Sequence, residues 1–135
     1  MHHLELPLYA ILLATLSRMV LGAIWYSPVA FLNPWMRMTG ITRDQMKQGF
    51  GGKIAGDVVG SFLMAGAMAH MVLWAGAAEI LGGLMVGFIC WLGFVAVSSI
   101  STVTYEKRPF GLWAIHNSYN LVSLLVMGLI IARWK

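Results

Sequence analysis

Charged residues and cysteine are both scarce in this 135-residue chain. Asp, Glu, Lys and Arg make up 10% of the sequence, whereas an average soluble domain carries roughly 25%. A soluble globular domain is therefore excluded as the main body of the chain. The single cysteine, Cys90, excludes an intrachain disulfide and a metal site built on cysteines, and we interpret it as a small packing residue.

Sequence signatures of catalysis are also missing. There is no nucleophile elbow, no His-Glu-x-x-His motif, no P-loop and no pair of carboxylates within an apolar stretch. The ten methionines are dispersed along the chain, which indicates core filling rather than copper handling. We therefore expect a protein that is not an enzyme, with no catalytic residues, no metal and no cofactor.

Apolar residues, by contrast, are abundant: 59% of the chain is hydrophobic, and the mean hydropathy is +0.77. About 20 residues of helix are enough to cross a hydrocarbon core about 30 Å thick. Four apolar stretches reach that length: residues 6–26, 54–75, 80–101 and 112–131. The sequence therefore predicts an all-α integral membrane protein. We expect residues 1–135 to form a single transmembrane domain, a four-helix up-down bundle.

The long connection between the first two stretches carries signals for two short helices. Asn33 before Pro34 predicts the N-cap of a first helix, which can end at Gly40. Thr42, with Gln45 three residues later, predicts a capping box for a second helix. Apolar and basic residues alternate here, as in helices that lie in the membrane interface. A plain solvated loop is the alternative.

Positively charged residues predict the orientation in the membrane. The first and third connections carry most of the Lys and Arg: Arg37, Arg43, Lys47, Lys53, Lys107 and Arg108. Such connections remain in the cytoplasm, so both termini should lie outside, although Arg133 and Lys135 weaken this assignment. The net charge of +4 is thus assigned to orientation and to contact with membrane lipid, and not to nucleic-acid binding.

Glycines recur every four residues in two places. Gly52, Gly56 and Gly60 enter the second stretch, and Gly83 and Gly87 repeat the spacing in the third. Rows of this kind let helix backbones approach each other closely. We expect either a homo-oligomer interface on one of these rows or ordinary packing within the chain.

An arginine lies near the middle of the first apolar stretch. A charge at that depth costs at least about 2.5 kcal/mol, so Arg18 must find a partner or water. Asp57 has the opposite charge, but both side chains tilt toward the N-termini of their own helices and so away from each other. Asn120 lies at a matching depth and is the predicted first partner. A water or a bound anion could link Arg18 to Asp57.

The last apolar stretch has one polar face. Four polar residues share it at helical spacing: His116, Tyr119, Asn120 and Ser123. Such a face must look into the bundle, because lipid cannot satisfy it. Serines of the third stretch fall in the same half of the membrane: Ser98, Ser99 and Ser101. The candidate ligand-binding residues are Arg18, Asp57, His116, Tyr119 and Asn120.

Two functions fit this polar cluster. Ionisable residues inside a membrane indicate a functional site, here one for binding or transporting a small, anionic solute, or for proton coupling. Buried polar residues also bond across membrane helices merely to fix packing. The alternative is therefore a structural or accessory subunit that packs against partner helices or lipid.

Several motifs resemble one known family. Residues 21–28 read Leu-Gly-Ala-Ile-Trp-Tyr-Ser-Pro, and residues 106–109 read Glu-Lys-Arg-Pro, followed by Trp113, His116-Asn117 and Tyr119. They resemble a bacterial family known only as a domain of unknown function, number seventeen sixty-one. The resemblance covers nearly the whole chain. It implies a small four-span protein of the bacterial inner (plasma) membrane, and it implies no activity.

Overall fold

A computed structural model of the chain describes residues 8–77 and 79–134, and this part is 83% helical with no strand. Within it, four helices are long and apolar enough to cross a membrane: Leu8–Trp25, Phe50–Trp74, Ile80–Thr104 and Phe110–Trp134. The prediction of an all-α membrane protein with four spanning helices is confirmed.

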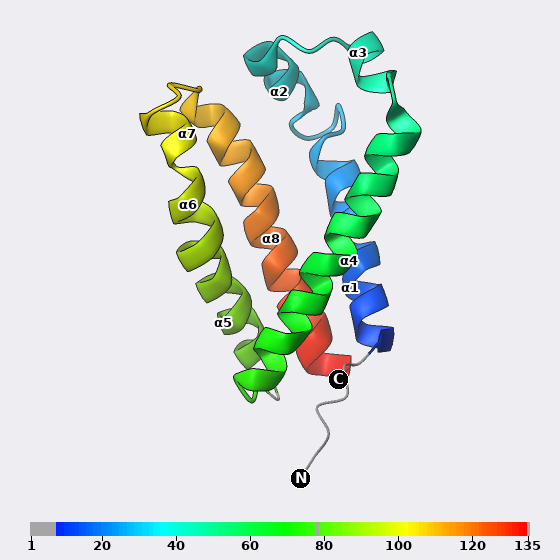
Figure 1. Cartoon of the computed structure of the whole chain (residues 1–135), viewed down its shortest axis with the longest axis vertical. Helices are drawn as coiled ribbons and strands as arrows, with labels where there is room; N and C mark the ends of the chain where they lie inside the picture. The colour runs from blue at the N-terminus through cyan, green and yellow to red at the C-terminus, as the bar shows by residue number, and fades with distance from the viewer. Residues whose placement is uncertain (1–7, 78, 135) are drawn as a thin grey trace.

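The spanning helices follow one another up and down the bundle (Figure 1). In chain order the elements are α1 (Leu8–Trp25), α2 (Leu32–Thr39), α3 (Arg43–Lys47), α4 (Phe50–Trp74), α5 (Ile80–Cys90), the π-helix η1 (Trp91–Ala96), α6 (Val97–Ser99), α7 (Ser101–Thr104) and α8 (Phe110–Trp134). The third span comprises α5, η1, α6 and α7. Helices α2, α3 and α7 all lie at one end of the bundle, called here the α2–α3 end.

The second and fourth spans are longer than their apolar stretches predicted. Helix α4 begins at Phe50 rather than near residue 54, directly after Gly49 in a left-handed conformation (φ 64°). Helix α8 covers Phe110–Trp134 instead of 112–131. Backbone hydrogen bonding continues past the edge of an apolar run, so hydropathy alone sets helix ends too short.

The two predicted short helices are both present at the α2–α3 end. Helix α2 ends at Gly40 in a left-handed conformation (φ 74°), as expected. The capping box of α3 is formed: Gln45 N donates to Thr42 Oγ1 at 3.2 Å, and Thr42 N donates to Gln45 Oε1 at 2.9 Å. The prediction of Asn33 as the N-cap of α2 was wrong, because the helix already begins at Leu32, with Phe31 at the N-cap.

The buried core fills the half of the bundle away from the α2–α3 end. It is built of alanine and larger apolar residues on α1, α4 and α8, centred on Ala10, Ala14, Ala65, Ala69, Val72, Met127 and Ile131. Helix α4 contributes buried residues only from Ser61 onward, whereas its residues 50–60 are exposed throughout. The half of the bundle that holds α2 and α3 is therefore less densely packed around α4.

Helices α5 and α8 pack through glycine at van der Waals contact of their backbones. A Cβ added at Gly83 would collide with the Gly128 carbonyl group and lie 2.8 Å from the Ala132 Cβ, and one at Gly87 would collide with the Leu124 carbonyl. The second glycine row is thus used within the chain. At the first row, Gly52, Gly56 and Gly60, an added Cβ would meet no packed atom within 4 Å among the described residues.

Candidate functional site

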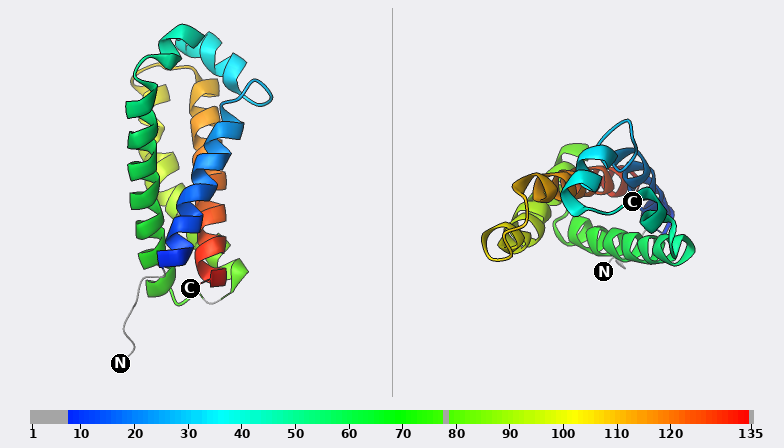
Figure 2. Two further views of the ribbon diagram at one scale, coloured as in Figure 1. Left: turned by 90° about the vertical axis from the view of Figure 1, so that its right-hand side faces the viewer. Right: turned by 90° about the horizontal axis from the view of Figure 1, so that it is seen from above.

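A cavity of about 820 Å³ lies between α1, α4 and α8 in the half of the bundle near α2 and α3. Figure 2 shows α2 and α3 crossing this end of the bundle from α1 to α4. The cavity is lined by Arg18, Met19, Gly22, Ala23, Tyr26, Trp35, Ile41, Met46, Phe50, Lys53, Ile54, Asp57, His116, Tyr119 and Asn120. The five residues predicted as a polar cluster therefore all line one cavity.

Arg18 points into the bundle and not toward lipid. Its Nη1 donates a hydrogen bond to Ser61 Oγ on α4 at 2.9 Å, while its buried Nε has no partner among the described residues. The prediction that Asn120 is the first partner was wrong. Arg18 tilts toward the N-terminus of α1, and Ser61 lies one turn deeper on α4 than Asp57, where the tilted side chain reaches it.

Tyr119 of α8 contacts both the backbone and the side chain of Arg18. Its hydroxyl donates to the Arg18 carbonyl oxygen at 3.0 Å, and its ring centroid lies 4.9 Å from the Arg18 Cζ. Gly22 makes room for this arrangement, because a Cβ there would stand 2.9 Å from the Tyr119 hydroxyl oxygen. The cation–π contact supplies part of the attraction that a carboxylate would otherwise provide.

An aromatic row continues from Tyr119 toward α2. Tyr26 contacts the Tyr119 ring edge-on at 5.6 Å between centroids and the Trp35 ring at 6.2 Å. The Tyr26 hydroxyl oxygen lies 2.6 Å from His116 Nδ1, within hydrogen-bonding distance. Burial raises the pKa of Tyr26 to about 12, so its phenol remains protonated near neutral pH.

Asp57 and Lys53 stand one turn apart on α4, at the side of the cavity nearer to α3. Lys53 Nζ donates to the backbone oxygens of Gln45 and Met46, both at 3.4 Å. Within residues 8–77 and 79–134, Asp57 is in no ion pair, so the Arg18–Asp57 bridge that the opposite charges suggest is not formed. The Asp57 carboxylate therefore remains available to a ligand.

The serines of the third span do not reach this cavity. Ser99 instead joins a separate hydrogen-bonded cluster with α8: Trp113 Nε1 donates to Ser99 Oγ at 3.0 Å, and Ser99 Oγ donates to Asn117 Oδ1 at 3.1 Å. Trp91, the first residue of η1, donates to the Asn117 carbonyl oxygen at 2.8 Å. This cluster satisfies its own polar groups and fixes the third span against α8, as interhelical hydrogen bonds do in membranes.

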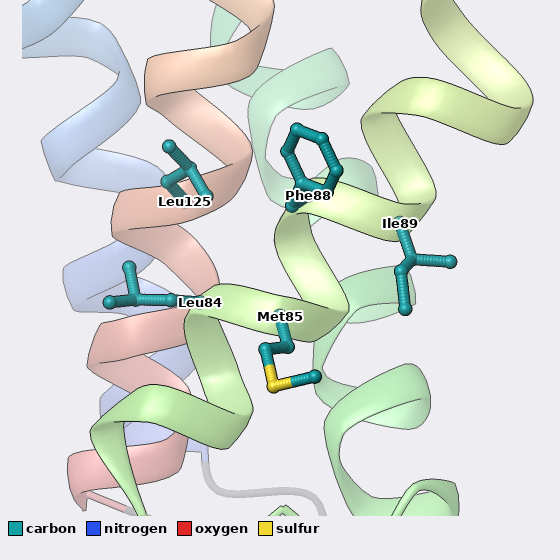
Figure 3. Close-up of a pocket in the computed structure, with 5 residues that line it drawn as sticks. All are labelled: Leu84, Met85, Phe88, Ile89 and Leu125. Carbon is teal, nitrogen blue, oxygen red and sulfur yellow. The ribbon is translucent and has the colours of Figure 1, made fainter.

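A smaller hollow of about 260 Å³ lies on the outer side of α5 and α8 (Figure 3). Its lining is entirely apolar: Leu84, Met85, Phe88, Ile89 and Leu125. Such a surface can accept a lipid chain, but it has no polar group to orient a ligand. Among the described residues, no group of three His, Cys, Asp or Glu side chains is close enough to hold a metal ion.

Sequence reasoning missed three lining residues of interest: Tyr26, Trp35 and Lys53. From the sequence alone, Tyr26 and Trp35 were interpreted as aromatic residues at the membrane interface. Lys53 was interpreted as one of the positive charges that orient the protein in the membrane. Only the folding of α2 and α3 over the bundle end brings Trp35 to the cavity wall. Gly22 lies one helical turn from Arg18, and that spacing predicts that both residues share one face of the first span.

Comparison with known proteins gives the family but no function. Neither the curated proteins nor the solved structures contain a match to this chain. A family model described as "protein of unknown function (DUF1761)" matches residues 9–132, which confirms the resemblance seen in the sequence motifs. The chain is therefore a member of the DUF1761 family of uncharacterised proteins, with four candidate membrane spans.

Proposed function

We propose that this membrane protein binds a small anionic solute in the cavity beside Arg18. The observation that carries the proposal is the cavity itself, about 820 Å³, which reaches an arginine in the interior of the bundle. A fully bonded cluster without a cavity, like that around Ser99 and Asn117, would have favoured a purely structural role. Ionisable residues inside a membrane commonly mark a solute or ion pathway.

The charges around the cavity favour an anion. Arg18 and Lys53 contribute two positive charges to the lining, against one negative charge from Asp57. The guanidinium is held by a neutral serine and an aromatic ring rather than by a carboxylate. Its charge is therefore not neutralised by the protein, and an anion would gain more from it than a cation or a neutral solute.

The proposed location is the bacterial inner membrane, with the α2–α3 end in the cytoplasm. The basic residues support this orientation, because those of the first and third connections gather at that one end. A solute would then approach from the cytoplasm, past α3 and the start of α4. Movement across the membrane would require an opening at the opposite end, where the apolar core is densely packed.

The second candidate function is that of a non-transporting accessory subunit. The exposure of every residue from 50 to 60 on α4 favours it, because a partner helix could pack there. A second copy of this chain is one such partner, and the open glycine row on α4 would suit it. We propose no enzymatic activity for either case.

Calorimetric titration of the purified protein with octanoate and with inorganic phosphate tests the proposal. Arg18→Gln should weaken the binding of either anion at least tenfold. Arg18→Lys should recover only part of the affinity, because it keeps the charge and loses the planar fork. Arg43→Gln is the matched control, since Arg43 lies at the same end of the protein but outside the cavity lining. Binding that is absent, or equal in wild type and Arg18→Gln, would contradict the proposal.

A further inference from the structure

The two ends of the cavity differ in chemistry. Toward the middle of the bundle the wall carries Arg18, Asn120 and the Tyr119 ring. Near α3 and the start of α4 the lining carries four apolar side chains, Ile41, Met46, Phe50 and Ile54, beside the charged Lys53 and Asp57. A ligand that fills both ends must therefore have a charged group and an apolar body.

Two N–H groups on this wall lack a hydrogen-bond acceptor. Arg18 Nε and Trp35 Nε1 are both buried, and neither has a partner in the described part of the chain. A buried donor without a partner costs about 1–3 kcal/mol, so the pair indicates that acceptors come from outside the protein. Trp35 supplies a neutral donor, which suits a carbonyl or ether oxygen better than a second charge.

The hydrogen bond to Ser61 leaves one edge of the Arg18 guanidinium without a partner among the described residues. Nη1 is committed to Ser61, whereas the edge formed by Nε and Nη2 makes no hydrogen bond within the described residues. An edge with two parallel N–H groups matches the two oxygens of a carboxylate or phosphate.

The separation and volume favour an elongated molecule. The eight-residue step from Arg18 to Tyr26, whose ring contacts Trp35, corresponds to about 12 Å along a helix axis. A water molecule takes up about 30 Å³ of liquid, and ligand pockets usually measure about 300–1,000 Å³. A cavity of about 820 Å³ would leave a simple inorganic anion surrounded by water.

We infer that the ligand is an elongated organic anion with a neutral hydrogen-bond acceptor at its far end. Its acid group binds Arg18, its apolar body lies along Tyr119 and Tyr26, and the neutral acceptor takes the hydrogen bond of Trp35 Nε1. This assignment of a ligand class rests on the proposed anion site.

Two probes of equal chain length separate the two donors. Octanoate has a carboxylate only, whereas the monomethyl ester of suberic acid adds an ester carbonyl at the other end. The ester should bind wild type about tenfold more tightly, the gain expected from one well-placed hydrogen bond. Trp35→Phe should abolish this preference, so that the ester and octanoate bind the variant with equal affinity. Trp113→Phe should retain it, because Trp113 donates to Ser99 outside the cavity.

The outcomes distinguish this inference from the proposal on which it rests. Equal binding of the two probes to wild type, or equal loss of both in Trp35→Phe, would overturn the inference. The anion site itself would still stand if Arg18→Gln weakened both probes. If neither probe nor inorganic phosphate showed binding that depended on Arg18, the anion site and the inference would both be wrong.

Discussion

Tyr119 and Arg18 are joined twice, across two helices that are far apart in the sequence. The Tyr119 hydroxyl donates to the Arg18 carbonyl oxygen at 3.0 Å, and the Tyr119 ring lies 4.9 Å from the Arg18 Cζ. The Tyr119 side chain of α8 thereby fixes the axial position of α1 relative to α8 and the orientation of the Arg18 guanidinium. Together with the hydrogen bond to Ser61, this explains how an arginine is retained inside the bundle without a carboxylate partner.

Gly22→Ala should displace Tyr119 and weaken the hold on Arg18. The new Cβ would stand 2.9 Å from the Tyr119 hydroxyl oxygen, closer than packed atoms allow. We expect a loss of about 1–3 kcal/mol in the free energy of unfolding, typical of overpacking, and weaker anion binding. Thermal unfolding in detergent and calorimetric titration would measure the two effects. Gly56→Ala is the control, because its added Cβ has no neighbour within 4 Å in the described part of the chain. Equal effects of the two variants would contradict this account.

The two glycine rows should respond differently to Leu. Gly83→Leu should prevent folding, because α5 and α8 meet there at the Gly128 backbone. Gly56→Leu and Gly60→Leu should leave the monomer folded and disrupt a homo-oligomer, if the open row on α4 is its interface. Light scattering after size exclusion in mild detergent, together with crosslinking in lipid, would report the assembly. A wild-type protein that is monomeric in both media would rule out the oligomer.

The α2–α3 end should face the cytoplasm. Single cysteines placed at Gln48 and Lys107, in a Cys90→Ala background, should react with a membrane-impermeant maleimide only after the cytoplasmic side is opened. Both positions are exposed at the end of the bundle where the basic connections gather. Reaction in intact cells would reverse the orientation and place the cavity toward the outside.

Tyr26 should make the protein less stable at high pH. Burial raises its pKa from 10.0 to about 12, so between these values the unfolded chain is ionised at Tyr26 while the folded chain keeps the proton. The unfolded state then binds fewer protons, and stability must fall as pH rises from about 10 toward 12. Below about pH 9 this group should have no effect. Denaturant unfolding would measure the free energy of unfolding of wild type and of Tyr26→Phe across this pH range. The difference between the two proteins should change only above pH 10. A difference that stays constant with pH would contradict the prediction.

Much of the architecture depends on local sequence. Apolar stretches of sufficient length determined four spanning helices, and the Thr42–Gln45 pair determined the start of α3, because both depend on neighbouring residues alone. The inward direction of Arg18 was also predictable, since a charge cannot face lipid without great cost.

Only the tertiary structure decided which polar groups meet. Residue counting gives depth along a helix axis but neither the rotation of the helix nor its distance from the next one. Ser61 rather than Asn120 therefore binds Arg18, and Ser99 pairs with Asn117 away from the cavity. Tertiary packing also distinguishes the two glycine rows, which look alike in the sequence. Packing of α5 against α8 buries Gly83, whereas the exposed first half of α4 leaves Gly56 open.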